Sequence, residues 1–211
     1  LYSVVFMVDY ALVARAVLRA ERGKAHQAQF RYMKLKQQVN PHFLFNSLNI
    51  LDCLVCEQRT EQASAYIHKL AGIYRYMLQN EEETLVRLRE EMAFVGMYVD
   101  LLQVRFPEGF RVETDISDEA MNRHVLPCSV QLLIENAIKH NSVGADRPLV
   151  IRIVAVAEAV TVSNNLQLKV SGNPSTRVGL NYIRQQYLDL SGIPIGIRRT
   201  DTEYCVTLPL L

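Results

Sequence analysis

The sequence predicts an α+β protein in which a helical N-terminal half precedes an α/β sandwich. Three observations predict this class. Apolar residues recur every three or four positions from Leu44 to Met77, as they do on packed helices. The run Phe110–Ile116 alternates strictly, as a half-buried strand does. Beyond it, β-branched runs alternate with further helical patterns, which indicates a sheet with interspersed helices.

Composition narrows the class of protein. At 211 residues, with 49% hydrophobic and 21% charged residues, the chain is typical of a globular protein of one or two domains. The formal net charge of +1 argues against a direct nucleic-acid partner. The sequence has four cysteines, and Cys53 and Cys56 form a C-x-x-C inside a helical pattern. We interpret them as small buried residues in a reducing compartment rather than as a zinc or redox site.

Residues 1–24 are interpreted as a membrane-proximal or signalling helix. Residues 1–18 are mostly apolar, and Arg19, Arg22 and Lys24 follow them. An apolar helix that leads into a basic flank is typical of the cytoplasmic end of a membrane span, although this run is short for a complete span. An amphipathic coiled-coil helix is the alternative.

A histidine lies at a predicted helix start. Asn40 can cap a helix and Pro41 suits its first turn, whereas a helix already running through residues 34–39 would be kinked by the proline. Either geometry presents His42, and Asn46 lies one turn later on the same face. The alternative is a hydrogen-bonded histidine inside a core helix.

Two helices are expected to form a hairpin on either side of a break at residues 56–60. Their apolar stripes comprise Leu44, Leu48, Leu51 and Val55 in the first helix, and Ile67, Leu70, Tyr74 and Met77 in the second. A short connection makes antiparallel neighbours the default. The combined face is too apolar for water, so we expect a dimer that forms a four-helix bundle.

A third helix is expected to begin near Glu90 and Glu91, because acidic residues suit a helix N-terminus. Its predicted buried residues are Val95, Tyr98 and Leu102. The turn signal at residues 107–109 is our domain boundary. We therefore assign residues 25–106 to a helical dimerisation domain and residues 107–211 to a sandwich domain.

The sandwich domain has regularly placed strand and helix signals. Strands are predicted at 110–116, 149–156, 160–163, 193–199 and 204–208, and helices from 127 and over 178–188. The stretch Glu135-Asn136-Ala137-Ile138-Lys139-His140-Asn141 gathers an acid, an amide and two basic groups at a helix end. An amide oxygen suits Mg²⁺ and a lysine can neutralise phosphate charge. A helix C-terminus with favourable cations is the alternative.

The histidine stretch resembles a known motif. Residues 38–49, Gln-Val-Asn-Pro-His-Phe-Leu-Phe-Asn-Ser-Leu-Asn, match the Q-x-x-P-H-F-L-F-N-x-L-N box of the LytS/YehU-type sensor histidine kinases. The resemblance implies that His42 is the phosphoacceptor, and Asn46 is our candidate for orienting its imidazole or a water. Because this family usually has membrane spans upstream, the resemblance favours a membrane-attached protein of the bacterial inner membrane, with these residues on the cytoplasmic side.

The second module resembles the GHKL (Bergerat-type) ATPase domain, and residues 135–141 resemble its N-box. The resemblance implies ATP as substrate, Asn136 as the Mg²⁺ ligand, and Lys139 and His140 near the nucleotide phosphates. Glu135 is a candidate polarising residue for the reaction.

Two further boxes depart from the family pattern. Asn164 stands where an aspartate would accept a hydrogen bond from adenine, and Leu166 stands in place of a glycine. In the second box Arg177 replaces a glycine, while Gly179 and Leu180 are kept at a helix start that can cradle phosphate. Residues 167–176 between the boxes are predicted to form a lid.

The resulting hypothesis is a sensor histidine kinase of a two-component system. It would use ATP and Mg²⁺ to phosphorylate His42 and would pass the phosphoryl group to an aspartate of a response regulator. Two alternatives stay open. A degenerate dimeric signalling scaffold would not bind ATP. A GHKL ATPase without histidine phosphorylation would keep hydrolysis after His42→Ala.

Overall fold

The computed structural model describes residues 41–169 and 178–211. Among the described residues, those up to Leu48 and those from Asn49 onward belong to separate units. The predictions for residues 1–24, for residues 34–39, for the Asn40 cap, for most of the lid and for Arg177 lie outside the described residues. None of the described helices is long and apolar enough to cross a membrane.

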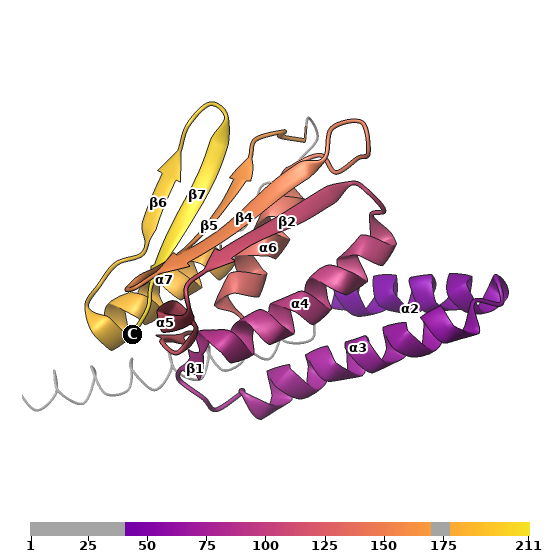
Figure 1. Cartoon of the computed structure of the whole chain (residues 1–211), viewed down its shortest axis with the longest axis horizontal. Coiled ribbons are helices and arrows are strands. Elements are labelled where there is room, and N and C mark those ends of the chain that lie inside the picture. The colour runs from indigo at the N-terminus through magenta and orange to yellow at the C-terminus, as the bar shows by residue number, and fades with distance from the viewer. Residues whose placement is uncertain (1–40, 170–177) are drawn as a thin grey trace, which may run out of the picture. The chain divides into compact units, whose positions relative to one another are not determined.

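The helical part has the predicted order. Helix α2 covers Pro41–Cys56, α3 covers Thr60–Gln79 and α4 covers Leu88–Arg105 (Figure 1). The turn between α2 and α3 uses Gln58 at φ 58°, and so falls at the predicted break. On α4, Val95, Tyr98 and Leu102 are buried as predicted.

The buried face of α3 differs from the predicted stripe. Its fully buried residues are Ala63, Tyr66 and Ile73, and this helix packs along α4. Ile67 of the predicted stripe is 48% exposed. A helix with apolar residues on more than one side produces this ambiguity, because spacing alone does not say which side meets the rest of the chain.

The sandwich domain contains a five-stranded sheet in the order β2-β4-β5-β7-β6. Its strands are β2 Phe110–Ile116, β4 Leu149–Val156, β5 Ala159–Asn165, β6 Gly196–Arg199 and β7 Glu203–Pro209. Strands β2 and β4 are parallel, with Val112 opposite Ile151, and the remaining pairs are antiparallel. All five predicted strands are confirmed, and the predicted α+β class with them.

Helices cover one face of this sheet. Helix α6, Ser129–His140, packs on β4 and β5, and α7, Val178–Ser191, packs against α6. Alternate residues of β4 and β5 face this layer and are buried, among them Ile151, Ile153 and Val162. Two short strands and a short helix were not predicted: β1 Val86–Arg87, which precedes the sandwich domain, pairs antiparallel with β3 His124–Val125, and α5 covers Asp118–Met121.

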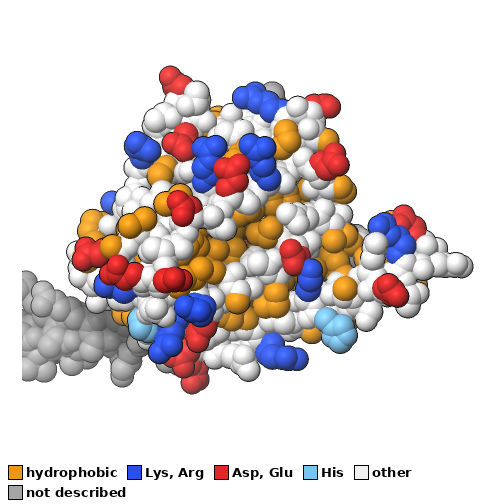
Figure 2. Space-filling view, in the orientation of Figure 1, with side chains coloured by type: hydrophobic (Ala, Val, Ile, Leu, Met, Phe, Trp, Pro, Cys, Tyr) orange, Lys and Arg blue, Asp and Glu red, His pale blue; other side chains and the backbone are white. Residues whose placement is uncertain are grey.

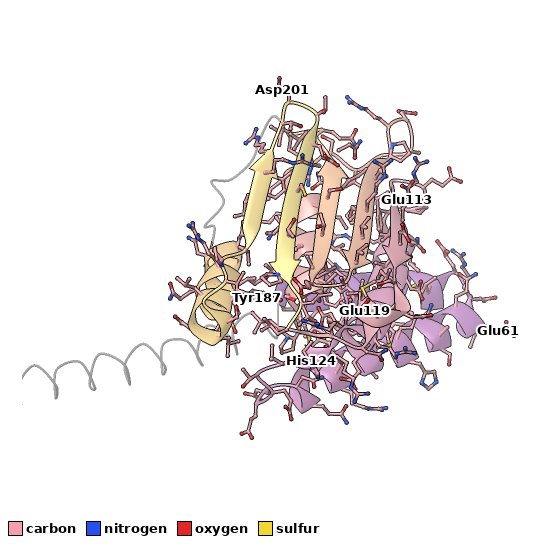
Figure 3. All side chains as sticks on the ribbon, turned by 60° about the vertical axis from the view of Figure 1, so that its left-hand side comes forward. Glu61, Glu113, Glu119, His124, Tyr187 and Asp201 are labelled. Carbon is pink, nitrogen blue, oxygen red and sulfur yellow. The ribbon has the colours of Figure 1, made fainter. Side chains whose placement is uncertain are left out.

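The other face of the sheet is open to solvent. Arg152 bonds to Glu113 at 2.8 Å across β2 and β4 on this face. Figure 2 shows basic and acidic side chains next to one another over the strands. Figure 3 places Glu113 on the β2 side and Asp201 at the tip of the β6–β7 hairpin. The nucleotide residues predicted from the sequence therefore have to be sought on the helical side.

Candidate functional site

His42 lies at the start of α2 with its side chain exposed. The side-chain amide nitrogen of Asn46 lies 3.0 Å from Nδ1 of the imidazole, one helical turn later. The direction of this hydrogen bond depends on the histidine tautomer and on the orientation of the amide. Nδ1 either accepts from the Asn46 NH₂ group or, when protonated, donates to the Asn46 oxygen. The predicted juxtaposition of these two side chains is confirmed, and a histidine buried in a core helix is excluded.

The hairpin exposes large apolar side chains. Phe45 is 65% exposed, Leu48 47% and Val55 60% on α2, and Leu78 on α3 is 66% exposed. Leu48 and Val55 belong to the stripe that the sequence predicts for packing. Apolar side chains at helical spacing and in contact with water are typical of an interaction surface.

Helix α6 carries the predicted N-box. Its apolar residues Val130, Leu133, Ile134 and Ala137 are buried as predicted. Glu135 is half-buried and accepts a hydrogen bond from the Gln131 amide at 3.1 Å. Asn136 is also half-buried, and its side-chain amide has no hydrogen bond within the described part of the chain. A partly exposed amide without a protein partner fits the role of a ligand for a hard cation.

Three basic side chains gather at the C-terminal end of α6. Lys139 is exposed and His140 half-buried, and the Lys169 ammonium donates to the carbonyls of Ile138 at 3.1 Å and of Lys139 at 3.2 Å. Burial lowers the pKa of His140, and the positive charges of Lys139 and Lys169 lower it further. The imidazole is therefore kept neutral next to two cations, at a helix end whose carbonyls favour positive charge.

Asn141 fastens the end of α6 to the segment that follows β5. It is buried, donates to the Ala137 carbonyl at 2.8 Å and accepts from the Gln167 backbone N–H at 2.8 Å. The Ser142 N–H donates to the Gln167 carbonyl at 2.7 Å. This role of Asn141 was not predicted, although an asparagine directly after a helix is the signal for such a cap.

The two boxes that depart from the family pattern lie at the end of β5 and at the start of α7. Helix α6 packs against both elements. Asn164 is buried in β5, and its amide nitrogen donates to the Asn165 carbonyl at 2.7 Å. Leu166 is half-buried, and its N–H donates to the Thr202 carbonyl at 2.8 Å. Gly179 and Leu180 open α7 in half-buried positions. The fold thus brings together the elements that carry Asn136, Asn164 and Gly179.

The N-terminal end of α6 is held by a side chain that the sequence analysis assigned to another helix. Glu91 of α4 is fully buried and accepts hydrogen bonds from the backbone N–H groups of Cys128 and Val130 and from the Tyr76 hydroxyl. Burial raises the pKa of Glu91, and the hydrogen bonds from Tyr76 and the α6 backbone partly oppose that rise. Its neighbour Glu90 bonds to the Arg87 N–H at 3.3 Å, as an acid in the first turn of α4 should.

The cysteine prediction is partly wrong. Cys53 and Cys56 are exposed, because the side of α2 that carries them is not covered, whereas Cys205 is buried. No group of three or more His, Cys, Asp or Glu residues suited to a metal ion occurs within 41–169 and 178–211. A magnesium site built on Asn136 would therefore depend on substrate and water oxygens for most of its ligands.

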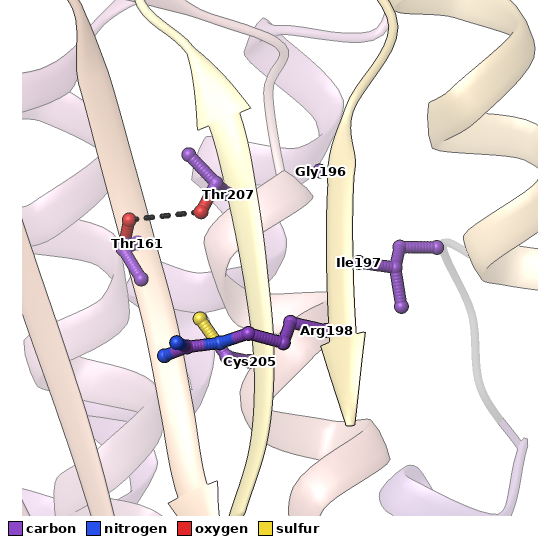
Figure 4. Close-up of a pocket in the computed structure, with 6 residues that line it drawn as sticks. All are labelled: Thr161, Gly196, Ile197, Arg198, Cys205 and Thr207. Atoms are coloured by element: carbon purple, nitrogen blue, oxygen red, sulfur yellow. Dashed lines mark hydrogen bonds between the residues drawn. The ribbon is translucent and has the colours of Figure 1, made fainter. Parts of the chain in front are cut away.

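A hollow of about 390 Å³ lies on the open face of the sheet (Figure 4). It lies over β5, β6 and β7, and its lining includes Arg198, Cys205 and the hydrogen-bonded pair Thr161 and Thr207, 3.1 Å apart. None of the predicted nucleotide residues that the structure describes lines it. It is separated from them by the sheet itself.

Comparison with known proteins agrees with the histidine box. The family model described as histidine kinase matches residues 30–110. A LytS sensor protein of Bacillus cereus is 39% identical over 106 residues, which are 50% of this chain and 18% of that protein. A LytS sensor histidine kinase/phosphatase of Staphylococcus aureus is 37% identical over 106 residues, again 50% of this chain and 18% of that protein. The LytS sensor protein of Staphylococcus haemolyticus is 28% identical over 190 residues, 82% of this chain and 32% of that protein.

These alignments span between 18% and 32% of the length of the curated relatives. Among solved structures, a bacterial phosphotransferase matches with 14% identity and a TM-score of 0.46, over 84% of this chain and 94% of that one. The Acinetobacter baumannii histidine kinase AdeS matches with 13% identity and a TM-score of 0.41, over 88% of this chain and 96% of that one. Residues 30–110 are thus similar to histidine kinases, and half of the chain is similar to LytS sensor proteins.

Proposed function

We propose that this chain is the kinase core of a two-component sensor, which uses ATP to phosphorylate His42 and passes the phosphoryl group to an aspartate of a response regulator. The observation that carries the proposal is the exposed imidazole of His42, one turn before Asn46 in an unbroken histidine box, with 3.0 Å between Nδ1 and the Asn46 amide. A phosphoacceptor has to be reachable by a nucleotide, and this histidine is exposed.

The Asn46 amide lies closer to Nδ1 of His42, at 3.0 Å, than to Nε2, at 3.5 Å, and we infer from this which ring nitrogen reacts. If the amide oxygen faces Nδ1, it accepts the Nδ1–H and leaves the Nε2 lone pair free. Nε2 would then attack the γ-phosphorus as the bond to the β-phosphate oxygen breaks and ADP leaves. Positive charge develops on the ring, and an amide oxygen at Nδ1–H stabilises it. Many other histidine kinases have an acid directly after the histidine; here that residue is Phe43, and Asn46 would take the orienting role.

The nucleotide would bind along α6. Lys139 and His140 would lie near the phosphates, the Asn164 amide oxygen would accept from the adenine amine, and Gly179 would open the phosphate-facing turn of α7. Glu135 would have a polarising role in the phosphoryl-transfer reaction. Asn136 would hold Mg²⁺, which neutralises phosphate charge when bound. The Asn136 amide, which has no hydrogen-bond partner among the described residues, and the lysines at the end of the same helix support this assignment.

We further propose a homodimer as the working form. The exposed apolar residues Phe45, Leu48, Val55 and Leu78 would pack against a second copy of the hairpin to complete a four-helix bundle. A membrane segment upstream would place these residues on the cytoplasmic side of the bacterial inner membrane, where the response regulator is found. The relatives that match are named as sensors, which supports this arrangement.

The test is incubation of the chain with Mg²⁺ and γ-labelled ATP beside a His42→Gln variant. The proposal predicts a label that acid removes, that survives base and that is absent from the variant. Folded dimers that bind ATP and hydrolyse it without a labelled histidine would support the ATPase alternative. Folded dimers that neither bind ATP nor take up label would support the scaffold alternative.

A further inference from the structure

The one fully buried carboxylate within the described residues belongs to Glu91 in α4. Its Oε2 accepts from the Tyr76 hydroxyl at 2.7 Å and from the Cys128 N–H at 2.9 Å, and its Oε1 accepts from the Val130 N–H at 3.0 Å. The donors come from α3 and from the first turn of α6. A buried acid with donors from two other helices fixes their relative positions, since each lost bond would leave a polar group unsatisfied.

Helix α6 has no capping side chain of its own. The residue before it, Cys128, is in the left-handed region at φ 61° and makes no side-chain cap. The first backbone N–H groups of a helix need acceptors, and a negative charge is favourable there because of the helix dipole. Glu91 supplies both from a different helix, 37 residues earlier in the chain.

Tyr76 extends this connection to the hairpin. Its ring stacks on Phe94 with centroids 4.3 Å apart and 11° between the planes, and its hydroxyl reaches Glu91. Tyr76 lies in the last turn of α3, and Phe94 lies one turn after Glu91 on α4. The hydroxyl is thus the polar contact through which α3 meets the acid that caps α6.

We propose that Glu91 is a positioning residue for the kinase reaction: it sets where α6 lies, and thereby where Asn136 and Lys139 meet the nucleotide, while Tyr76 couples that position to α3. This inference rests on the proposed function of α6. Asn136 lies six residues after Val130, or about 9 Å along the helix. A tilt at the held end is therefore carried to the nucleotide residues, and a misplacement of about 1 Å can cost about 100-fold in rate.

The test compares Glu91→Gln and Tyr76→Phe with Glu90→Gln, an exposed neighbour on the same helix turn. The glutamine keeps the shape of the acid but turns an NH₂ group toward donors, so we expect the Kd for Mg²⁺-ATP to rise about tenfold. Tyr76→Phe keeps the ring and the cap, so the Kd should stay within about twofold while labelling of His42 at saturating ATP slows about fivefold. Glu90→Gln should change neither value.

A lower melting temperature in Glu91→Gln and Tyr76→Phe, with Kd and labelling rate within about twofold of the parent, would show that the cluster is only structural and would overturn the proposal. If Glu91→Gln fails to fold, Tyr76→Phe carries the test through the same split between Kd and rate.

Failure of the proposed function is recognised separately, because the parent chain would then neither bind nor label. Amide hydrogen exchange still tests the positioning in that case. Faster exchange in Glu91→Gln at both 128–131 and 136–140 supports it, and faster exchange at 128–131 alone contradicts it.

Discussion

The two functional helices of this chain are built in opposite ways. Helix α2 presents His42 exposed, and the polar contact of this imidazole with Asn46 comes from the same helix. Helix α6 is buried along one side, and its two ends are held by residues from elsewhere in the chain, Glu91 at the first turn and Lys169 beyond the last. A phosphoacceptor needs access, whereas a nucleotide-binding helix needs a fixed position. The difference in construction fits the two tasks that we propose for these helices.

The largest effect should come from the nucleotide helix. Asn136→Ala removes the proposed Mg²⁺ ligand, and we expect labelling of His42 to fall at least about 100-fold. Because the Asn136 side chain makes no hydrogen bond to the described protein, the melting temperature should stay close to that of the parent. Labelling rates at several Mg²⁺ concentrations measure this. An unchanged rate would remove Asn136 from the site.

Loss of the Glu91 carboxylate should show in stability. Glu91→Ala leaves the Tyr76 hydroxyl and two backbone N–H groups without acceptors in a buried place, so we expect about 3 kcal/mol less unfolding free energy. Urea unfolding of this variant beside Glu90→Ala measures the difference. If both variants lost the same unfolding free energy, the buried hydrogen bonds of Glu91 would contribute no more to stability than the exposed Glu90 does.

Asn46 should matter for rate but not for fold. Asn46→Ala removes the contact at Nδ1 of His42, and we expect about tenfold slower labelling, the equivalent of one hydrogen bond. Asn49→Ala is the matched control, since Asn49 is also an exposed asparagine of α2. Similar rates in both variants would assign Asn46 to helix packing.

The cations at the end of α6 predict a pH effect. Because the pKa of His140 is lowered in the folded chain, the unfolded chain binds more protons just below pH 6.5. Stability from this group is therefore present above about pH 6.5 and is lost as pH falls through the lowered pKa. His140→Gln should flatten the plot of unfolding free energy against pH in that range. Lys139→Gln should raise the pKa of His140, which NMR measures. A His140 pKa at or above its ordinary value would contradict the geometry.

The open face of the sheet should give the smallest effect. Glu113 pairs with Arg152 and Arg111 in full contact with solvent, where ion pairs are screened. Glu113→Gln is expected to shift the melting temperature by less than about 2 °C, and less still in high salt. A scanning calorimetry trace at two salt concentrations is sufficient. A large shift would mark this face as more than a solvated surface.

Features that depend on contacts between residues close in sequence could be predicted, whereas features that depend on distant residues could not. The strands β2 and β4 appear at their predicted bounds, because alternation of side chains is written in consecutive residues. The pairing of His42 with Asn46 follows from a spacing of four on one helix.

Glu91 was predicted as an N-terminal acid of α4. Its hydrogen bonds to the backbone at the start of α6 were not predicted. The contact joins residues 39 positions apart, and nothing in the neighbouring sequence distinguishes Glu91 from Glu90. The exposure of Cys53 and Cys56 was missed for a related reason, since helical spacing does not say which side of α2 is covered. Residues held by distant partners are the ones that sequence reasoning fails to find.

The most direct measurement locates the phosphoryl group on the labelled chain. Tandem mass spectrometry under non-acidic conditions would identify the residue, and phosphorus–nitrogen coupling in the NMR spectrum would identify the ring nitrogen. We expect phosphate on Nε2 of His42, with Nδ1 directed at Asn46. Phosphate on His68 or His140, or on Nδ1 of His42, would contradict it.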